Sequence, residues 1–96
     1  MNDFQRECIE TCLKVLRDLG FDSCQFREMS GKTESYLVAQ IPIEDQHAEI
    51  YVYNDETGLM VNKQWFVCER PDFQSDKELI RAFSEMLSEK LTRTSK

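Results

Sequence analysis

The stretch from Tyr36 to Cys68 constrains the fold most, because it holds three β-rich runs that turn-forming residues separate. The runs are 36–43 (YLVAQIPI), 48–54 (AEIYVYN) and 59–68 (LMVNKQWFVC). Runs of this length that are rich in Val, Ile, Tyr and Trp are typical of strands, and the NDETG cluster at 54–58 is typical of a hairpin turn. The sequence therefore predicts an antiparallel sheet with one firm turn at its centre.

Alternation along the two central runs predicts which side chains share a face. With Asp55 to Gly58 as a four-residue loop, Tyr53 faces Met60 and Val52 faces Val61. Because strand side chains point alternately to opposite faces, the core face carries Ala48, Ile50, Val52, Leu59 and Val61. The opposite face carries Glu49, Tyr51, Tyr53 and Met60.

The run at 59–70 does not fit one regular strand, since strict alternation would place Lys63 opposite Ile50 on the core face. Either a bulge near Asn62 and Lys63 resets the alternation, or a tight turn there divides the run into two short strands. Without a reset Trp65 and Val67 point inward and Phe66 outward. With a reset Phe66 and Cys68 point inward and Trp65 faces solvent. We expect Trp65 inward, and both arrangements stay open.

Two helices flank the strands. Apolar residues repeat at helical spacing from Phe4 to Leu19, with Asn2 and Gln5 as a capping box and Gly20 at the C-terminal end. A second capping box at 75–78 (SDKE) starts the other helix, whose apolar stripe is Leu79, Ile80, Phe83, Met86, Leu87 and Leu91. Residues 92–96 lack this periodicity and are expected to fray.

These elements predict a single α+β domain over residues 1–96, large enough to bury a core without covalent links. We expect a two-layer sandwich in the order helix, antiparallel β-meander of three or four strands, helix, with both helices on one sheet face. Residues 23–29 are the expected edge strand ahead of the three central runs.

The charged residues are distributed unevenly along the chain, and this limits the classes of partner that the protein is expected to bind. The 96-residue chain has a net charge of −6, and residues 33–62 contain six acidic residues and no Lys or Arg. Such a stretch repels phosphate and anionic lipid, so we expect no nucleic-acid or membrane partner but a basic one. No apolar run approaches the roughly 20 residues that span a bilayer, and the N-terminus lacks a signal-peptide core. We expect a cytoplasmic protein.

No motif for catalysis, a cofactor or a metal stands out. The GKT at 31–33 lacks the upstream glycine of a phosphate-binding loop, and the four cysteines lack paired zinc-ligand spacing. We expect all four cysteines to be reduced core residues, and His47 to be a solvated histidine without a nucleophile. The chain is therefore not expected to be an enzyme.

The function predicted is that of a small acidic protein-interaction module, homodimeric, that binds a basic partner through its Tyr-bearing sheet face. The alternative is a protein that binds a cationic small molecule, since aromatic faces and carboxylates both attract cations. A second copy is one expected cover for the apolar outer face. The expected binding residues are Tyr36, Glu49, Tyr51, Tyr53, Met60 and Trp65.

Overall fold

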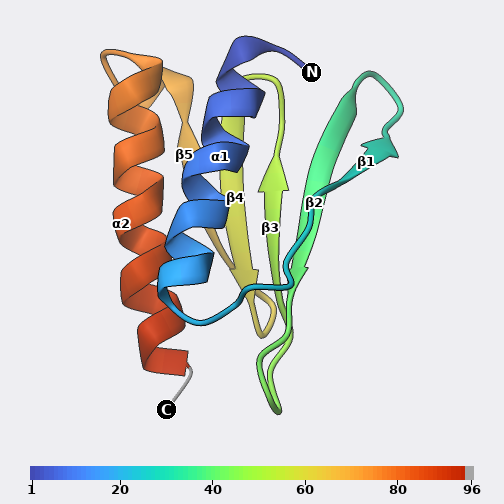
Figure 1. Ribbon diagram of the computed structural model, residues 1–96. Coiled ribbons are helices and arrows are strands. Elements are labelled where there is room, and N and C mark those ends of the chain that lie inside the picture. Colours follow the sequence, from blue (N-terminus) through green and yellow to red (C-terminus); the bar gives the residue numbers. More distant parts are fainter. Residues whose placement is uncertain (95–96) are drawn as a thin grey trace.

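In a computed structural model of the chain, which describes residues 1–94, two helices pack on a five-stranded antiparallel sheet (Figure 1). The strands neighbour one another in chain order, as a meander. The elements are α1 (Asp3–Asp18), β1 (Arg27–Ser30), β2 (Ser35–Ile41), β3 (Ala48–Val52), β4 (Glu56–Val61), β5 (Gln64–Glu69), the short 3-10 helix η1 (Arg70–Asp72) and α2 (Asp76–Thr94). The α+β class and the antiparallel sheet are confirmed, but the predicted count of three or four strands is wrong.

The extra strand arises at Asn62 and Lys63, whose φ angles of 49° and 74° both lie in the left-handed region. Two such residues form the tight turn that the right-handed twist of a hairpin favours, so Val61 pairs directly with Gln64. The 59–70 run is therefore two strands. Phe66 turns toward the helices, and Trp65 points outward with 53% of its surface exposed, so the preferred inward orientation of Trp65 was wrong.

The central hairpin also has a tighter loop than the four residues predicted. The N–H of Tyr53 donates to the carbonyl of Glu56 (2.8 Å), which leaves only Asn54 and Asp55 in the loop. Ile50 consequently faces Leu59, a register shifted by four residues from the predicted one. An even shift leaves every side chain on its face, so the predicted core set, Ala48, Ile50, Val52, Leu59 and Val61, is buried.

The first strand is shorter than the predicted 23–29. It begins at Arg27, which faces Val38, and all four of its residues are exposed. The preceding residues form a turn and an extended segment that passes the end of β2, where the Cys24 thiol lies 3.7 Å from the carbonyl of Gln40. The edge strand is thus short, and only its first residues lie close to the linker from α1.

Both ends of α1 follow the sequence prediction. The Asn2 side chain accepts from the N–H of Gln5 (2.8 Å), and the Gln5 side chain accepts from the N–H of Asn2 (2.9 Å). At the other end Gly20 has φ 97°, and the N–H of Phe21 donates to the carbonyl of Leu16 (2.8 Å). The left-handed conformation of Gly20 and the hydrogen bond from Phe21 to Leu16 reverse the direction of the chain, so that Phe21 packs against the core.

The start of α2 departs from a full capping box. Ser75 accepts from the N–H of Glu78 (3.2 Å), but the Glu78 carboxylate takes the N–H of Gln74 instead of that of Ser75. The helix continues to Thr94, past the predicted end of its apolar stripe at Leu91. Of the predicted frayed tail, residues 95 and 96 lie outside the part of the chain described.

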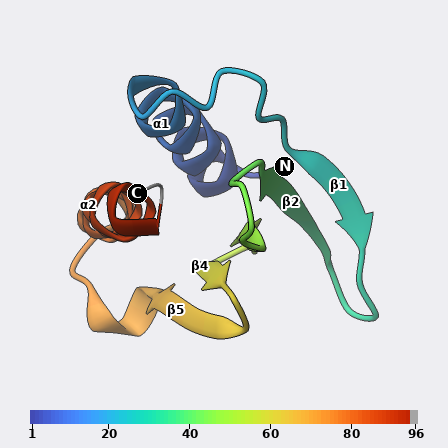
Figure 2. The ribbon, with the colours of Figure 1, turned by 90° about the horizontal axis from the view of Figure 1, so that it is seen from below.

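The core lies between the helices and the sheet, as the end view shows (Figure 2). Its centre is sealed from solvent, with no exposed surface on Leu16, Ile50, Leu59, Phe83 and Leu87. Both helices cover the same sheet face, and among residues 1–94 no element crosses the opposite face (Figure 2). That opposite face, here the outer face, carries the residues predicted to bind.

Candidate binding face

Four aromatic rings form a continuous row on the outer face, which we name the aromatic ladder: Tyr36 of β2, Tyr51 of β3, Tyr53 just after β3, and Trp65 of β5. The centroids of Tyr36 and Tyr53 are 5.0 Å apart, and those of Tyr51 and Tyr53 are 6.4 Å apart. Tyr51 and Trp65 lie 5.0 Å apart with their planes tilted by 47°. Such separations are those of interacting aromatic pairs, so the ladder is one connected surface.

Gly58 makes the contact between Tyr51 and Trp65 possible, because it lies on β4 between their strands. It faces Tyr51 on one side and Val67 on the other. A Cβ atom built there would already be 3.5 Å from Val67 Cγ2 and 3.8 Å from Trp65 Cε3. A larger side chain would stand where the two rings approach each other, so this glycine leaves space for them to meet over β4.

The ladder covers a thin apolar layer of its own. Val38 and Met60 are each only 8% exposed although no helix lies over them, and each lies opposite a residue of the ladder in the sheet: Val38 opposite Tyr51 and Met60 opposite Trp65. Trp65 and Val67, in contrast, are 53% and 48% exposed. Exposed apolar surface of this kind, contiguous with rings, is typical of an interaction site.

Glu49 lies within the outer face and is largely enclosed, with its side chain 13% exposed. Its carboxylate accepts from the Tyr51 hydroxyl (2.7 Å) and from Gln40 Nε2 (3.4 Å), and lies 3.5 Å from His47 Nε2. Burial acts to raise the pKa of Glu49, but these partners outweigh burial and lower it. Its charge is thus occupied in orienting Tyr51.

Tyr51 shows the same contact from the other side. Burial and then the hydrogen bond to the Glu49 carboxylate raise the pKa of Tyr51 to about 12. The hydroxyl therefore stays protonated and keeps donating to Glu49 at any physiological pH. The ring of Tyr51 is fixed in the middle of the ladder as a result.

Acidic side chains gather beside the Tyr53 end of the ladder; we name this group the acidic end: Glu34, Asp55, Glu56 and Glu69. Glu56 and Glu69 face each other directly across β4 and β5. Burial raises the pKa of Glu56, and the nearby charges of Glu69, Asp55 and Glu34 raise it further. The group therefore holds more negative charge than its own surroundings compensate.

A cavity of about 200 Å³ lies at the acidic end and is lined by Asp55, Glu56, Glu69, Arg70 and Pro71. The guanidinium of Arg70 is engaged elsewhere, since it pairs with Asp76 (3.0 Å) and lies 5.2 Å from the centre of the Phe4 ring. Of the acidic end, Glu34 accepts a neutral hydrogen bond from Asn54 Nδ2 (2.8 Å). The cavity is thus lined by three carboxylates and by one guanidinium that is already paired with Asp76.

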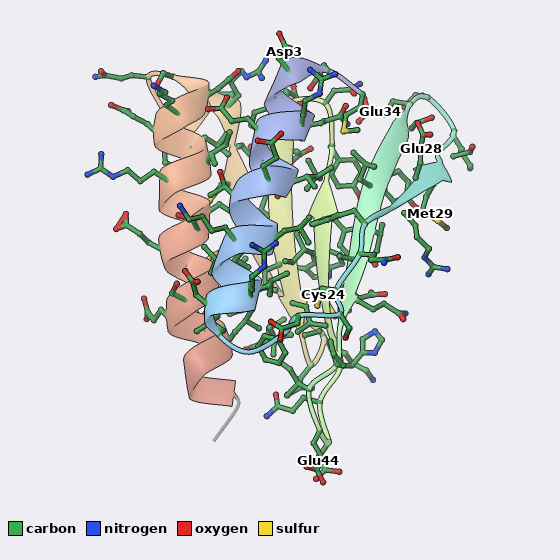
Figure 3. The ribbon with its side chains drawn as sticks, viewed as in Figure 1. Asp3, Cys24, Glu28, Met29, Glu34 and Glu44 are labelled. Carbon is green, nitrogen blue, oxygen red and sulfur yellow. The ribbon has the colours of Figure 1, made fainter. Side chains whose placement is uncertain are left out.

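The acidic stretch of the sequence does not form one strip in space. Figure 3 shows Glu34 near the end of the molecule where Asp3 and the N-terminus lie, and Glu44 at the tip of the opposite end. Glu49 lies between them and is hydrogen-bonded, as described above. Only the residues at the Tyr53 end therefore act together with the ladder.

All six residues predicted to bind lie on the outer face, but their roles differ. Tyr36, Tyr51, Tyr53 and Trp65 present rings, whereas Met60 is buried beneath them and Glu49 is an internal support. Sequence reasoning missed Val67, which the misplaced alternation had turned inward, and Glu69, whose neighbour is known only from the β4–β5 register. It also missed Gly58, which it placed in the loop between the two central strands and not on β4.

Two further cavities lie outside the acidic end. One of about 370 Å³ lies between the start of α1 and β2, and includes Gln5, Glu28 and Ser35. One of about 340 Å³ lies near the β2–β3 loop, and includes Gln40, Pro42 and His47. Figure 3 shows Glu28 and Met29 at the β1 edge, away from the helices. Only Tyr36 of the ladder borders either cavity.

The four cysteine thiols lie inside the fold. All four cysteines are free and buried. The hydrogen bond that the Cys12 thiol donates to Cys8, together with burial, raises the pKa of Cys12, whereas the same hydrogen bond lowers the pKa of Cys8. Burial also raises the pKa values of Cys24 and Cys68. Among residues 1–94, no group of three or more His, Cys, Asp or Glu side chains is placed to hold a metal ion.

Neither described helix is long and apolar enough to cross a membrane. Comparison with protein-family models, with curated proteins and with solved structures returned no match.

Proposed function

We propose that this protein is a small interaction module that binds a basic polypeptide segment through the aromatic ladder and the acidic end. The observation that carries this proposal is the juxtaposition of the two: a row of rings ends at Glu56 and Glu69, whose carboxylates face each other. Aromatic faces attract Lys and Arg side chains, and carboxylates add charge attraction and steering.

The acidic end would bind the first cation of such a segment. Like charges directly opposite each other on a sheet are unfavourable, and the raised pKa of Glu56 reflects that repulsion after burial. A bound guanidinium or ammonium would relieve it. Because Arg70 is held by Asp76, the partner would supply the missing positive charge.

A polypeptide fits the ladder better than a small molecule does. The rings extend over three strands of an uncovered sheet, and a segment lying across them would cover several rings at once. The cavity at the acidic end supports the alternative, a cationic small molecule, since it is about 200 Å³ in volume. The two are distinguished by whether the ring of Trp65, far from that cavity along the ladder, takes part in binding.

We propose a binding role instead of a catalytic one for the polar residues of this face. The carboxylate of Glu49, which contacts both Tyr51 and His47, is the centre of the arrangement on the outer face that most resembles an active site. General acid–base groups work best with pKa values near the operating pH. The pKa of Tyr51 is raised to about 12 and that of Glu49 is lowered, so both move away from neutrality.

The location and the assembly are also proposals. We propose the cytoplasm, where thiols stay reduced, because all four cysteines are free. We propose that the homodimer does not form by stacking two outer faces on each other. A second copy on the outer face would bring another net charge of −6 against the acidic end.

The test uses Trp65, which is the only tryptophan and lies in the ladder. Its fluorescence is followed while an oligo-arginine peptide, an oligo-glutamate peptide or arginine amide is added. We expect the oligo-arginine peptide alone to shift the emission at micromolar concentration, and its affinity to fall with salt. Equal responses to the acidic peptide would contradict the proposal, and saturation by arginine amide would favour the small-molecule alternative.

Variants assign the binding to the two parts of the site. Tyr53→Ala should weaken binding at any salt concentration, while Glu56→Gln should weaken it mainly at low salt. Glu44→Gln is the matched control, because it removes one carboxylate at the opposite end of the molecule. An equal loss in the Glu44 and Glu56 variants would mean that only the net charge matters.

A further inference from the structure

The two edges of the sheet differ in their readiness to pair with another strand. β1 at one edge has only four residues and includes Arg27 and Glu28. β5 at the other edge has six residues, no proline, and a charge only at its last residue, Glu69. Proteins protect exposed edges with short strands, charges or proline. β1 has this protection, whereas β5 lacks it.

The free hydrogen-bonding groups of β5 follow from its pairing with β4. The N–H of Arg70 donates to the carbonyl of Asp55 (3.3 Å). Hydrogen-bonded and non-hydrogen-bonded pairs alternate along an antiparallel ladder, so Gln64, Phe66 and Cys68 bond to β4. The N–H and C=O groups of Trp65 and Val67 therefore point to the open edge.

The same two residues carry the exposed apolar surface of this strand. Trp65 is 53% and Val67 48% exposed, both on the outer face, while Phe66 between them is half-buried on the helix face. Free backbone groups and exposed apolar side chains thus coincide at the middle of β5. This coincidence points to a partner that is itself an extended strand.

We propose that β5 pairs antiparallel with β5 of a second copy of this chain, and so joins two five-stranded sheets into one. Residues opposite each other must lie on the same face, and their backbone groups must either both be directed at the shared edge or both be directed away from it. A two-fold axis at Phe66 meets both conditions. It places Phe66 opposite Phe66 of the second copy, and Trp65 opposite Val67 of the second copy.

Charge complementarity favours this register over its neighbours. With Phe66 on the axis, Lys63, in the turn that precedes β5, comes level with Glu69 of the second copy. The two-fold symmetry repeats this pair at the other end of the paired strands. Within one copy Glu69 lies opposite Glu56, so a lysine from the second copy would reduce the repulsion between these two carboxylates. A shift by one pair in either direction separates Lys63 from Glu69 and brings Trp65 or Val67 opposite itself.

The dimer would extend the binding face. The axis is perpendicular to the sheet, so both sets of helices stay on one side and both aromatic ladders on the other. Trp65 of each copy would cover Val67 of the other, and the two ladders would meet at the axis. This inference goes beyond the proposed function, because the dimer forms without any basic partner.

The first test is the native mass by light scattering at tens of micromolar without a partner, where we expect twice the mass of one chain. Lys63→Glu should weaken the dimer roughly tenfold, since it places two carboxylates opposite each other. Glu69→Lys should do the same, and the double reversal should restore the dimer. Lys32→Glu, the same change in the turn beside β1, is the matched control and should leave the mass unchanged.

The second test reads the register. Phe66→Cys should form a disulfide-linked dimer on oxidation, because non-hydrogen-bonded cross-strand pairs bring their Cβ atoms to about 4.5–5.5 Å. Met29, on the opposite edge strand, is more exposed than Phe66. The Met29→Cys variant should nevertheless stay monomeric on oxidation. Circular dichroism confirms that each variant is folded.

A monomeric wild type would overturn the proposal, as would equal effects of Lys63→Glu and Lys32→Glu. Cross-linking through residue 29 but not residue 66 would also overturn it. Since no partner is present, these outcomes leave the proposed function of the ladder standing, and a failure to bind basic peptides would leave the dimer standing.

Discussion

Glu56 and Glu69 lie directly opposite each other on β4 and β5, so two carboxylates occupy one cross-strand pair of the outer face. No requirement of the fold explains this pair, since like charges at opposed positions destabilise a sheet. Burial and then the neighbouring charges raise the pKa of Glu56. The pair is thus a stability cost that binding of a cation would offset.

Replacing Glu56 by Gln should therefore stabilise the protein by about 0.2–1 kcal/mol at pH 7, the usual size of a cross-strand pair effect. A raised pKa in the folded state means that the wild type is most stable below the ordinary glutamate pKa and loses stability as pH rises through the raised value. The gain from the variant should accordingly shrink toward pH 4. Urea unfolding at both pH values measures it, and a gain that is larger at pH 4 would contradict the assignment.

Gly58 should tolerate alanine but not valine. A Cβ atom there meets its neighbours at 3.5–3.8 Å, which is ordinary contact, so Gly58→Ala should leave the ladder intact. The branched side chain of Gly58→Val would push Trp65 away from Tyr51. We expect the tryptophan emission of the valine variant to resemble that of exposed indole and its affinity for oligo-arginine to fall, while the alanine variant matches the wild type.

Glu49→Ala should destabilise the protein by roughly 1–2 kcal/mol at pH 7, because it removes a charged acceptor of hydrogen bonds. The lowered pKa of Glu49 means that its contribution is present above the ordinary glutamate pKa and is lost as pH falls through the lowered value. The two proteins should therefore converge in stability at acidic pH. Thermal unfolding between pH 3 and pH 7 tests this, and a difference that does not depend on pH would argue for lost packing instead.

Truncating the core at Ile50 should cost about 2–4 kcal/mol, the usual penalty for a cavity left by a buried aliphatic side chain. Ile50 has no exposed surface and lies between Ala39 and Leu59 on the helix face of the sheet. Chemical denaturation of Ile50→Ala gives the value. Val67→Ala on the outer face is the control and should lose far less; a loss below 0.5 kcal/mol for Ile50→Ala would mean that the helix face is misassigned.

The cysteines should be reduced and protected. All four are buried and free, so a thiol reagent should label four groups per chain in denaturant without prior reduction. In the native protein, labelling should be slow, because a reagent needs local opening to reach these thiols. A count of two or none in denaturant would show disulfides and remove the argument for the cytoplasm.

Local signals in the sequence were enough for both ends of α1 and for the faces of the two central strands, β3 and β4. Asn2 with Gln5 and Gly20 act within one or two turns of chain, so their roles could be predicted without tertiary information. The predicted face of Ile50 was correct although the predicted register was wrong, because the register error was an even number of residues. Features that depend only on residues close together in the sequence were therefore predictable.

The orientation of Trp65 was not predictable in this way. It depends on Asn62 and Lys63 adopting left-handed conformations, and lysine there gives little sequence signal for such a turn. The acidic end could not be predicted from the sequence either, since Glu56 and Glu69 are brought together only by the β4–β5 register. Gly58 has a visible role only once Tyr51 and Trp65 are seen on either side of it.

The meander itself has a consequence for how the chain folds. Every strand pairs with its neighbour in sequence, so the sheet can grow by successive hairpins with short loop closures. The helices, in contrast, come from the two ends of the chain and meet only on the finished sheet (Figure 1). Folding should therefore be rapid for a protein of this strand content, and its last step should be the docking of α1 beside α2. An early species with a formed sheet and undocked helices would expose both faces of that sheet, which makes helix docking the step most sensitive to aggregation.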